Sequence, residues 1–407
     1  MTSNSSTGGG PAPAALGTVV VVGAGATGRG HVAQLAAESG YGLVLLDKDR
    51  ALCDALKRSG GYDVRLVSAH PRTVRIHGFR IFHTSETEGF YPAFREAGTV
   101  FTAVCPGNIP EAAAYMRQHF ARWLRETASA EGPGAFKNVL CCENMDRSST
   151  TFGSILKDGF PGELLPSLEQ RVGFADTMVA RVVARPADPL SLLGEEYSEW
   201  TADRTALRGP AHPAVRTLEL VDHQERYLRR KLYIHNAGHA TFGYLGFLKG
   251  YRFIHEAGQD PELSDICSRA IEESGWAIEK EYGFSADVIS AYRAALTQKC
   301  ASAELPDEIL RVVREPARKL GREERFFGPI ELMLRHGRVP EYLLYGVCAA
   351  LLARIPGDEQ SLRVQELMKA LGPTCLPEIV GAAVDARVLN RVGSLLPQVQ
   401  RRFARGA

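Results

Sequence analysis

The sequence predicts an α/β N-terminal domain with a mostly parallel sheet, followed by an all-α C-terminal domain. Apolar, β-branched runs alternate with helical stretches up to about residue 205, which is typical of βαβ units. Beyond about residue 210, apolar residues recur at helical spacing between Pro and Gly residues, and we expect no strand there. We therefore predict a disordered tail at 1–15, a first domain at 16–209 and a second at 210–407.

Composition and charge exclude several classes of protein. The 407 residues include 48 Lys+Arg and 47 Asp+Glu, and this balance predicts neither nucleic-acid nor membrane-surface binding. No apolar run approaches the roughly 18 residues that span a bilayer. Residues 1–15 lack the basic start and apolar stretch of a secretory signal, so we expect a cytoplasmic protein. The eight cysteines form no CxxC pair, which indicates reduced thiols and not a zinc site or disulfide framework.

The secondary-structure elements follow from these patterns. A buried strand that ends in glycines is expected to precede a helix from Gly28 to Ser39. The predicted strands are 18–22, 43–46, 99–105, 138–142 and 179–183. The predicted helical segments of the second domain are 215–256, 262–282, 286–299, 307–320, 328–337, 341–354 and 360–371.

A glycine-rich loop follows the first predicted strand and matches G-x-G-x-x-G. In a dinucleotide-binding loop, the first glycine allows the tight turn, the second lets the backbone approach the pyrophosphate, and the third lets helix and strand pack closely. The N–H groups and dipole of the following helix favour phosphates. The loop predicts a Rossmann-type domain whose cofactor contacts are Gly23, Gly25, Ala26, Thr27 and Gly28.

An acidic residue stands where such a domain reads the ribose. Asp47 ends the second predicted strand, 19 residues after Gly28. Its carboxylate would accept hydrogen bonds from the ribose hydroxyls and repel a 2′-phosphate, so NAD is predicted over NADP. Lys48 and Arg50 follow closely and keep NADP open.

A second loop is a candidate for the nicotinamide side of the crevice. Cys105 and Pro106 follow a later strand of the same sheet, where loops at the carboxyl ends of strands line a cofactor site. A plain turn explains this segment equally well.

A basic segment in the second domain carries the candidate catalytic residues. At about 100° per residue, Lys231 and His239 lie about 80° apart on a helix, and Asn236 lies about 60° beyond His239. His235 falls between Lys231 and His239. Alcohol oxidation needs a base for the hydroxyl proton, for which a desolvated lysine is suited, and donors for the developing alkoxide. The alternative is a solvated basic helix.

Two other interpretations of this segment stay open at this point. Tyr227 and Lys231 match Y-x-x-x-K, the pair of short-chain dehydrogenases, although the chain is far longer than that family. His235 and His239 stand at i, i+4, which suits a metal on a helix. Because no HExxH motif and no third ligand are evident, we predict no metal.

Several motifs in order carry a resemblance to a known family. They are K-x4-N-x2-H (231–239), G-A-G-x-x-G-R-G (23–30), C-E-N-M (142–145), S-E-W (198–200), G-F-L-K-G (246–250) and R-V-x-R-x-P-x-R-K-L (311–320). From about residue 18 to 385, the chain resembles the polyol-specific long-chain dehydrogenase/reductase family. The resemblance implies a zinc-independent enzyme with a Rossmann-type domain and a helical domain.

The resemblance also implies catalytic roles. Lys231 would be the general base. Asn144 and Asn236 would hold the alkoxide or carbonyl oxygen, and Asn144 would also border the cofactor. His239 would orient the substrate.

The residues expected to contact the substrate include some that the resemblance implies and some that depart from the family. The resemblance implies that Arg311 and Lys319 bind the far end of the substrate, where a phosphate could sit. Ala180 stands where the family has an aspartate, and Cys105 where it has a glycine. His235 replaces an apolar residue and becomes a further candidate substrate contact. We expect the hydride chemistry to be retained, while the altered residues leave open whether the substrate is mannitol 1-phosphate or another compound.

Three functions are therefore compared. The first is an NAD-dependent oxidoreductase that transfers hydride between a sugar alcohol, with or without phosphate, and its ketose. The alternative is a redox-neutral dehydratase, lyase or epimerase that uses NAD+ to oxidise a sugar or nucleoside transiently. The third is an NAD-binding sensor or scaffold. The expected partners are a small-molecule substrate and, at most, a few copies of the same chain, with neither nucleic acid nor membrane.

Overall fold

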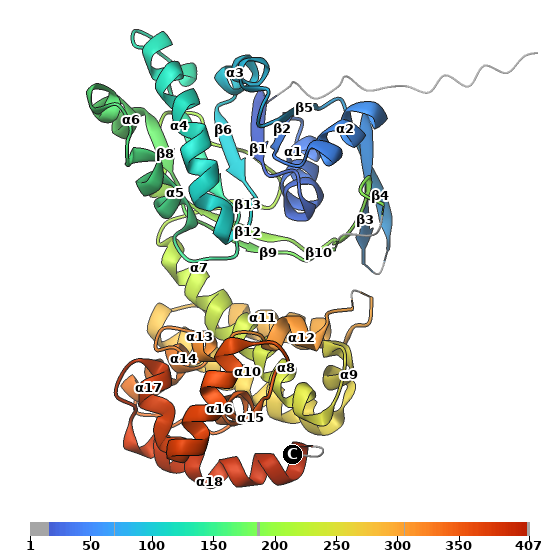
Figure 1. Ribbon diagram of the computed structural model, residues 1–407, viewed down its shortest axis with the longest axis vertical. Helices are drawn as coiled ribbons and strands as arrows, with labels where there is room; N and C mark the ends of the chain where they lie inside the picture. Colours follow the sequence, from blue (N-terminus) through green and yellow to red (C-terminus); the bar gives the residue numbers. More distant parts are fainter. Residues whose placement is uncertain (1–15, 69, 185–187, 305, 405–407) are drawn as a thin grey trace, which may run out of the picture. The chain divides into compact units, whose positions relative to one another are not determined.

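The computed structural model describes residues 16–68, 70–184, 188–304 and 306–404 (Figure 1). The described residues fold as two compact units, which divide between Gln224 and Glu225. The tail predicted at 1–15 lies outside the described residues. Across the described part of the chain, no helix combines the length and apolarity that crossing a bilayer requires.

A parallel sheet forms the centre of the first unit. Its strand order is β5-β2-β1-β6-β7-β8, and every neighbouring pair is parallel. The β-branched run of β1 is buried on both faces, as a central parallel strand requires. This confirms the predicted parallel sheet. The strands are β1 (Thr18–Val22), β2 (Gly42–Asp47), β5 (Arg80–His83), β6 (Thr99–Thr102), β7 (Lys137–Cys141) and β8 (Val172–Phe174).

Helices cover both faces of this sheet. Val19 and Val21 belong to one apolar core together with the helical residues Val32 and Leu35. Alternate residues of β1 face a second core, which includes residues of α3, α4 and α5. The side chains of one strand thus supply two cores, which defines a doubly wound sheet. The helices are η1 (Gly28–Ala33), α1 (Gln34–Glu38), α2 (Arg50–Ser59), α3 (Thr87–Glu96), α4 (Ile109–Glu126), α5 (Ser148–Lys157) and α6 (Leu165–Arg171).

Two smaller sheets complete the first unit and correct the sequence prediction. The run predicted as one strand at 179–183 divides between two sheets, because the chain leaves β9 after Ala180 and pairs again only at Val183. A strand also lies beyond residue 210, where none was predicted: β13 pairs with β12 and extends the first unit to Gln224. The strands are β3 (Gly61–Val67), β4 (Arg72–His77), β9 (Thr177–Ala180), β10 (Val183–Ala184), β11 (Ser191–Glu195), β12 (Glu199–Asp203) and β13 (Leu218–Val221).

The second unit is helical and has one apolar core. The helix predicted at 215–256 begins only at Gln224 and ends at Gly250, whose φ is +80°. The helix predicted at 307–320 is divided before Pro316, because a proline cannot continue the backbone hydrogen bonds. The helices are α7 (Gln224–Arg230), η6 (Lys231–Asn236), α8 (Ala237–Lys249), α9 (Ile254–Gln259), α10 (Pro261–Tyr282), α11 (Ala286–Ala301), α12 (Ile309–Val313), α13 (Pro316–Lys319), α14 (Phe327–Arg335), α15 (Leu343–Leu352), α16 (Glu359–Leu371), α17 (Leu376–Val380) and α18 (Ala386–Phe403).

Candidate active site

The predicted cofactor residues of the first unit gather at one edge of the parallel sheet. The glycine loop follows β1, and Asp47 is the last residue of β2. Cys105 lies three residues beyond β6, and Asn144 three residues beyond β7. Because β2, β1, β6 and β7 are neighbours and parallel, all four segments lie at their carboxyl ends.

The geometry of the loop requires glycine at two positions. Gly23 has a φ of +94°, and a Cβ there would lie 2.6 Å from the carbonyl oxygen of Ala103. A Cβ on Gly28 would lie 1.8 Å from the carbonyl oxygen of Gly23. The helix begins at Ala26 and Thr27, so their N–H groups belong to its first turn. The loop therefore has the tight turn and the close internal packing that a dinucleotide-binding loop requires at its first and third glycines.

The Asp47 carboxylate is fastened to this loop. Its Oδ2 accepts a 2.6 Å hydrogen bond from the N–H of Ala24, and its Oδ1 accepts one of 2.9 Å from Asp49. Each carboxylate oxygen keeps a further lone pair. The acid is therefore held beside the loop and can still accept from a ribose hydroxyl.

The two basic residues after Asp47 have other partners. The Lys48 ammonium lies 2.5 Å from Glu111 Oε2 and also donates to Asn108. The Arg50 guanidinium contacts His83 Nδ1 at 2.9 Å and Ser85 Oγ at 2.5 Å. Binding of a 2′-phosphate by either cation would therefore require these contacts to break.

A buried glutamate that the sequence analysis missed fixes the second loop. Glu143 is 6% exposed and accepts hydrogen bonds from the Thr102 hydroxyl and, at 2.8 Å, from the N–H of Val104. Burial raises its pKa, and these hydrogen bonds oppose the rise. Glu143 thus joins the end of β6 to the segment after β7. Its neighbour Asn144 is exposed. Glu143 lies within the C-E-N-M motif, directly before the candidate residue Asn144, and this position is the signal that could have identified Glu143.

Cys105 occupies a backbone conformation that favours glycine. Its φ is 73° and its ψ is 149°, and its side chain is exposed. Val104 before it is held by Glu143, and Pro106 after it starts a short helical turn. A residue with a Cβ costs roughly 1–3 kcal/mol in this region. The backbone at Cys105 therefore carries strain.

Replacing Cys105 with glycine is expected to raise the free energy of unfolding by about 1 kcal/mol. The gain is the released strain less the greater chain entropy of glycine in the unfolded state. Urea unfolding of Cys105→Gly measures it, and Cys105→Ser is the control because serine keeps the Cβ. Equal stability of the glycine and serine variants would contradict the strain at this position.

The catalytic candidates of the second unit lie in a helix with a π turn. Lys231–Asn236 forms the π segment η6 between α7 and α8. A π turn connects residue i to residue i+5, so Lys231 and Asn236 lie one turn apart on the same face. This corrects the separation of about 140° that regular α-helical geometry predicts. Both side chains are half-buried.

The packing around this segment uses two close contacts at glycines. A Cβ on Gly238 would lie 2.4 Å from Ile271 Cγ1 in α10. A Cβ on Gly328 would lie 2.3 Å from the ring of Tyr233, which belongs to η6. Neighbouring helices therefore pack closely against the π segment and the residues that follow it.

Two histidines follow on the same stretch. The ring centroids of His235 and His239 are 6.0 Å apart. Burial, followed by the positive charge of Lys299, lowers the pKa of His235 well below its ordinary value. Burial also lowers the pKa of His239, and a hydrogen bond to Asp307 opposes that shift. Both imidazoles are therefore neutral at pH 7.

Asp307 is a second residue that the sequence analysis missed. Its Oδ2 lies 3.1 Å from Nε2 of His239, and the Arg311 guanidinium binds both carboxylate oxygens at 2.6–2.7 Å. Burial raises the pKa of Asp307, but His239 and Arg311 outweigh it and lower the pKa to about 2. The structure thus brings His239 and Arg311 together through an ionised carboxylate.

The amine of Lys319 is engaged elsewhere. Lys319 is buried, and its ammonium donates to the carbonyl oxygens of Val312 and Arg314. Burial, followed by the nearby Arg325 and Arg318, lowers its pKa to about 7. Lys319 secures the end of α12, which carries Arg311, and the structure does not bring its ammonium to His239.

Tyr227 packs within the second unit, and Ala180 within the first. The Tyr227 ring packs edge-on against Phe284 at 5.6 Å, with the Arg230 guanidinium 5.2 Å away. Ala180 is buried at the end of β9, and the following Arg181 donates to Gln34 within the first unit. Within residues 16–68, 70–184, 188–304 and 306–404, no three His, Cys, Asp or Glu side chains are grouped as a metal site.

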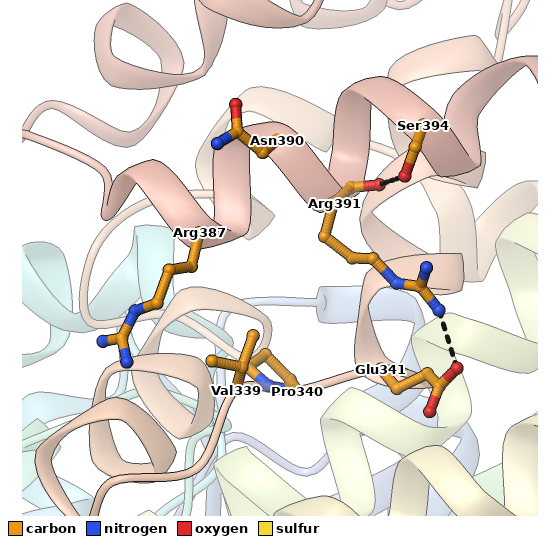
Figure 2. Close-up of a pocket in the computed structure, with 7 residues that line it drawn as sticks. All are labelled: Val339, Pro340, Glu341, Arg387, Asn390, Arg391 and Ser394. Atoms are coloured by element: carbon orange, nitrogen blue, oxygen red, sulfur yellow. Dashed lines mark hydrogen bonds and ion pairs between the residues drawn. The ribbon is translucent and has the colours of Figure 1, made fainter.

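A surface hollow of the second unit lies between α18 and the segment before α15 (Figure 2). Its Arg391 guanidinium pairs with Glu341 at 2.7 Å, and Arg387 pairs with Asp385. Its lining contains none of the predicted site residues. The lining residues are Val339, Pro340, Glu341, Arg387, Asn390, Arg391 and Ser394.

Comparisons with known proteins agree in family and fold. Residues 17–213 match the mannitol dehydrogenase Rossmann domain, and residues 223–372 match the mannitol dehydrogenase C-terminal domain. The chain is 28% identical over 387 residues to mannitol-1-phosphate 5-dehydrogenase of Thermoanaerobacter pseudethanolicus, covering 94% of this chain and 97% of that protein.

Two solved structures have the same fold over nearly the whole chain. The mannitol 2-dehydrogenase of Pseudomonas fluorescens, in a ternary complex with NAD and D-mannitol, has a TM-score of 0.72 at 17% identity, covering 96% of this chain and 94% of that one. A substrate-free D-sorbitol dehydrogenase has a TM-score of 0.74 at 15% identity, covering 94% and 93%. These structures confirm a Rossmann-type domain followed by a helical domain.

Proposed function

Because the chain belongs to the mannitol dehydrogenase family, we propose that it is an NAD-dependent oxidoreductase that transfers hydride between a sugar alcohol and its ketose. One observation carries the proposal: the π turn stacks Lys231 and Asn236 on one face, next to a neutral His239. A base, an amide donor and a polar orienting group are the parts that alcohol oxidation requires.

The first unit suits a dinucleotide. At Gly23 and Gly28 any Cβ would clash with the backbone of the loop and its neighbours, and the Asp47 carboxylate is held at the loop by Ala24. In the proposal, the loop N–H groups hold the pyrophosphate and Asp47 binds the ribose. Cys105 and Pro106 border the nicotinamide. NAD, when bound, accepts the hydride from the carbinol carbon.

The residues of the second unit manage the proton and the oxygen. In the oxidative direction, the Lys231 amine takes the proton of the reacting hydroxyl. The Asn236 amide donates to the alkoxide as negative charge develops on it. His239 orients another part of the substrate.

The substrate in this proposal is an unphosphorylated polyol. Lys319 donates to backbone carbonyls, and Arg311 forms a bidentate pair with Asp307. Binding a phosphate with these two cations would first require both sets of contacts to break. The relative from Thermoanaerobacter pseudethanolicus acts, by its name, on mannitol 1-phosphate, so hexitols and hexitol phosphates both belong in the test.

The redox-neutral alternative needs a proton donor for the departing hydroxyl. The pKa of His235, the candidate for that role, is lowered well below its ordinary value. An imidazole that stays neutral is a poor acid near pH 7. This favours the dehydrogenase over the lyase.

Absorbance at 340 nm tests the proposal. Purified protein would be incubated with NAD+ and a panel of hexitols, hexitol phosphates and furanosyl nucleosides, with product analysis on the same samples. Steady NADH formation with one hexitol is expected. Product with a flat 340 nm trace would replace the proposal with the redox-neutral reaction, and no product with any of them would overturn it.

Substitution of Asp47 is expected to weaken NADH binding by about tenfold or more. Asp47→Ala removes the ribose acceptor and leaves the Ala24 N–H without its partner, a loss of about 1–3 kcal/mol. Fluorescence titration with NADH and NADPH measures it, and the preference for NADH should fall. Asp49→Asn removes the same charge two residues away and keeps the cap of α2. Unchanged binding by Asp47→Ala, or equal loss in the control, would contradict the assigned role.

A further inference from the structure

We infer that Asp307 is a positioning residue that holds His239 in one tautomer, with Nε2–H donating to Asp307 and Nδ1 accepting from a substrate hydroxyl. This inference rests on the proposed function and deepens it. It concerns a residue that none of the sequence motifs includes.

The contact is direct and accessible. His239 Nε2 lies 3.1 Å from Asp307 Oδ2, and the two side chains are 22% and 21% exposed. The histidine is therefore fixed from one side and still reachable by a ligand. Arg311 holds both oxygens of the Asp307 carboxylate, and the Oδ2 atom also contacts the imidazole.

The backbone also holds Asp307 in place. The carbonyl oxygen of Asp307 accepts a 2.9 Å hydrogen bond from the N–H of Ile254, and Ile309 donates to Arg252 at the same distance. These bonds flank a bridge between the segment before α9 and the segment before α12. A group supported in this way is preorganised and does not need the substrate to order it.

The surrounding charges favour a neutral imidazole. The charged groups that act on His239 are Arg311 from α12, Lys299 from α11 and Asp307 itself. His235 lies one helical turn away from His239. Its pKa is lowered by burial and then by the positive charges of Lys299 and Lys231, so it is also neutral. A neutral imidazole that donates through one nitrogen must accept through the other. His239 would therefore select a hydroxyl, which donates, over a carbonyl or ether oxygen, which cannot.

The tautomer of His239 is directly measurable by NMR. Full-length protein labelled with 15N-histidine would be examined at pH 7, with His239→Gln used to assign the signals. The wild type is expected to show His239 protonated at Nε2 only. Asp307→Asn, whose amide can either accept or donate, is expected to show a mixture of the two tautomers. A wild type protonated at Nδ1, or an unmixed Nε2–H form in Asp307→Asn, would overturn the inference.

Kinetics provide the second readout. Asp307→Asn is expected to lower kcat/KM for the polyol by about 10- to 100-fold, mainly through KM. Glu308→Gln is the matched control, because it removes the same charge from the adjacent exposed residue, whose carboxylate pairs with Arg252. If Asp307→Asn does not fold, Asp307→Glu keeps the acceptor and should retain the Nε2–H tautomer. A kcat/KM equal to wild type in Asp307→Asn would overturn the inference.

The two readouts separate this inference from the proposed function. The tautomer is observed without substrate. If no polyol is oxidised but the NMR result is as expected, the proposed function fails while the Asp307–His239 arrangement stands. If a polyol is oxidised but Asp307→Asn leaves the tautomer of His239 unchanged, the inference about Asp307 fails while the proposed function stands.

Discussion

Replacing Lys231 with alanine is expected to lower kcat by about 10³-fold while the affinity for NADH stays within about twofold of wild type. In the proposed mechanism, the Lys231 amine is the group that accepts the hydroxyl proton. The cofactor contacts, in contrast, all belong to residues of the first unit. Steady-state absorbance at 340 nm measures the first effect, and NADH fluorescence titration measures the second.

The control for this substitution is Lys280→Ala, which removes an exposed lysine from α10. It should leave kcat unchanged. Added methylamine should partly restore turnover to Lys231→Ala, because a free amine can accept the same proton. Near-normal turnover in Lys231→Ala would remove this residue from the role of base.

Replacing Gly28 with valine is expected to weaken NADH binding by at least about 100-fold and to lower the free energy of unfolding by about 1–3 kcal/mol. Its Cβ would lie 1.8 Å from the carbonyl oxygen of Gly23. That atom belongs to the backbone, so only a shift of the whole loop relieves the clash. Fluorescence titration and urea unfolding measure the two effects.

Gly98→Ala is the matched control for the loop substitution. Gly98 is exposed, and no atom lies within 4 Å of the position that its Cβ would take. It should bind NADH as the wild type does. Tight NADH binding by Gly28→Val would show that the loop does not hold the cofactor.

The elements of the fold that the sequence predicts are those with continuous apolar runs. β1 and β2 follow this pattern and are buried, as parallel central strands require. β4 is different, because most of its residues are partly or fully exposed and no apolar run marks it. β13 likewise has only four residues, with one buried. Such strands are stabilised by partners distant in sequence, which local patterns do not reveal.

The residues of the candidate site likewise fall into those that local sequence patterns identify and those that they do not. The glycine loop and Asp47 are recognisable because each supplies a function through its own local conformation. Glu143 and Asp307 were missed because each acts on a residue 39 to 68 positions away, namely Val104 and His239. The facing of Lys231 and Asn236 was missed because a regular α-helix was assumed where the chain forms a π turn.

That π turn makes activity depend on the integrity of the surrounding core. An isolated peptide of 224–249 that became helical would favour i→i+4 bonds, and Lys231 and Asn236 would then diverge. In the folded protein, close packing at Gly238 and around Tyr233 surrounds the wider turn. Loosening that packing would return the segment to an ordinary helix with no loss of helical content. Inactivation by heat or denaturant should therefore precede unfolding, with catalysis disappearing while circular dichroism still records the full helical content.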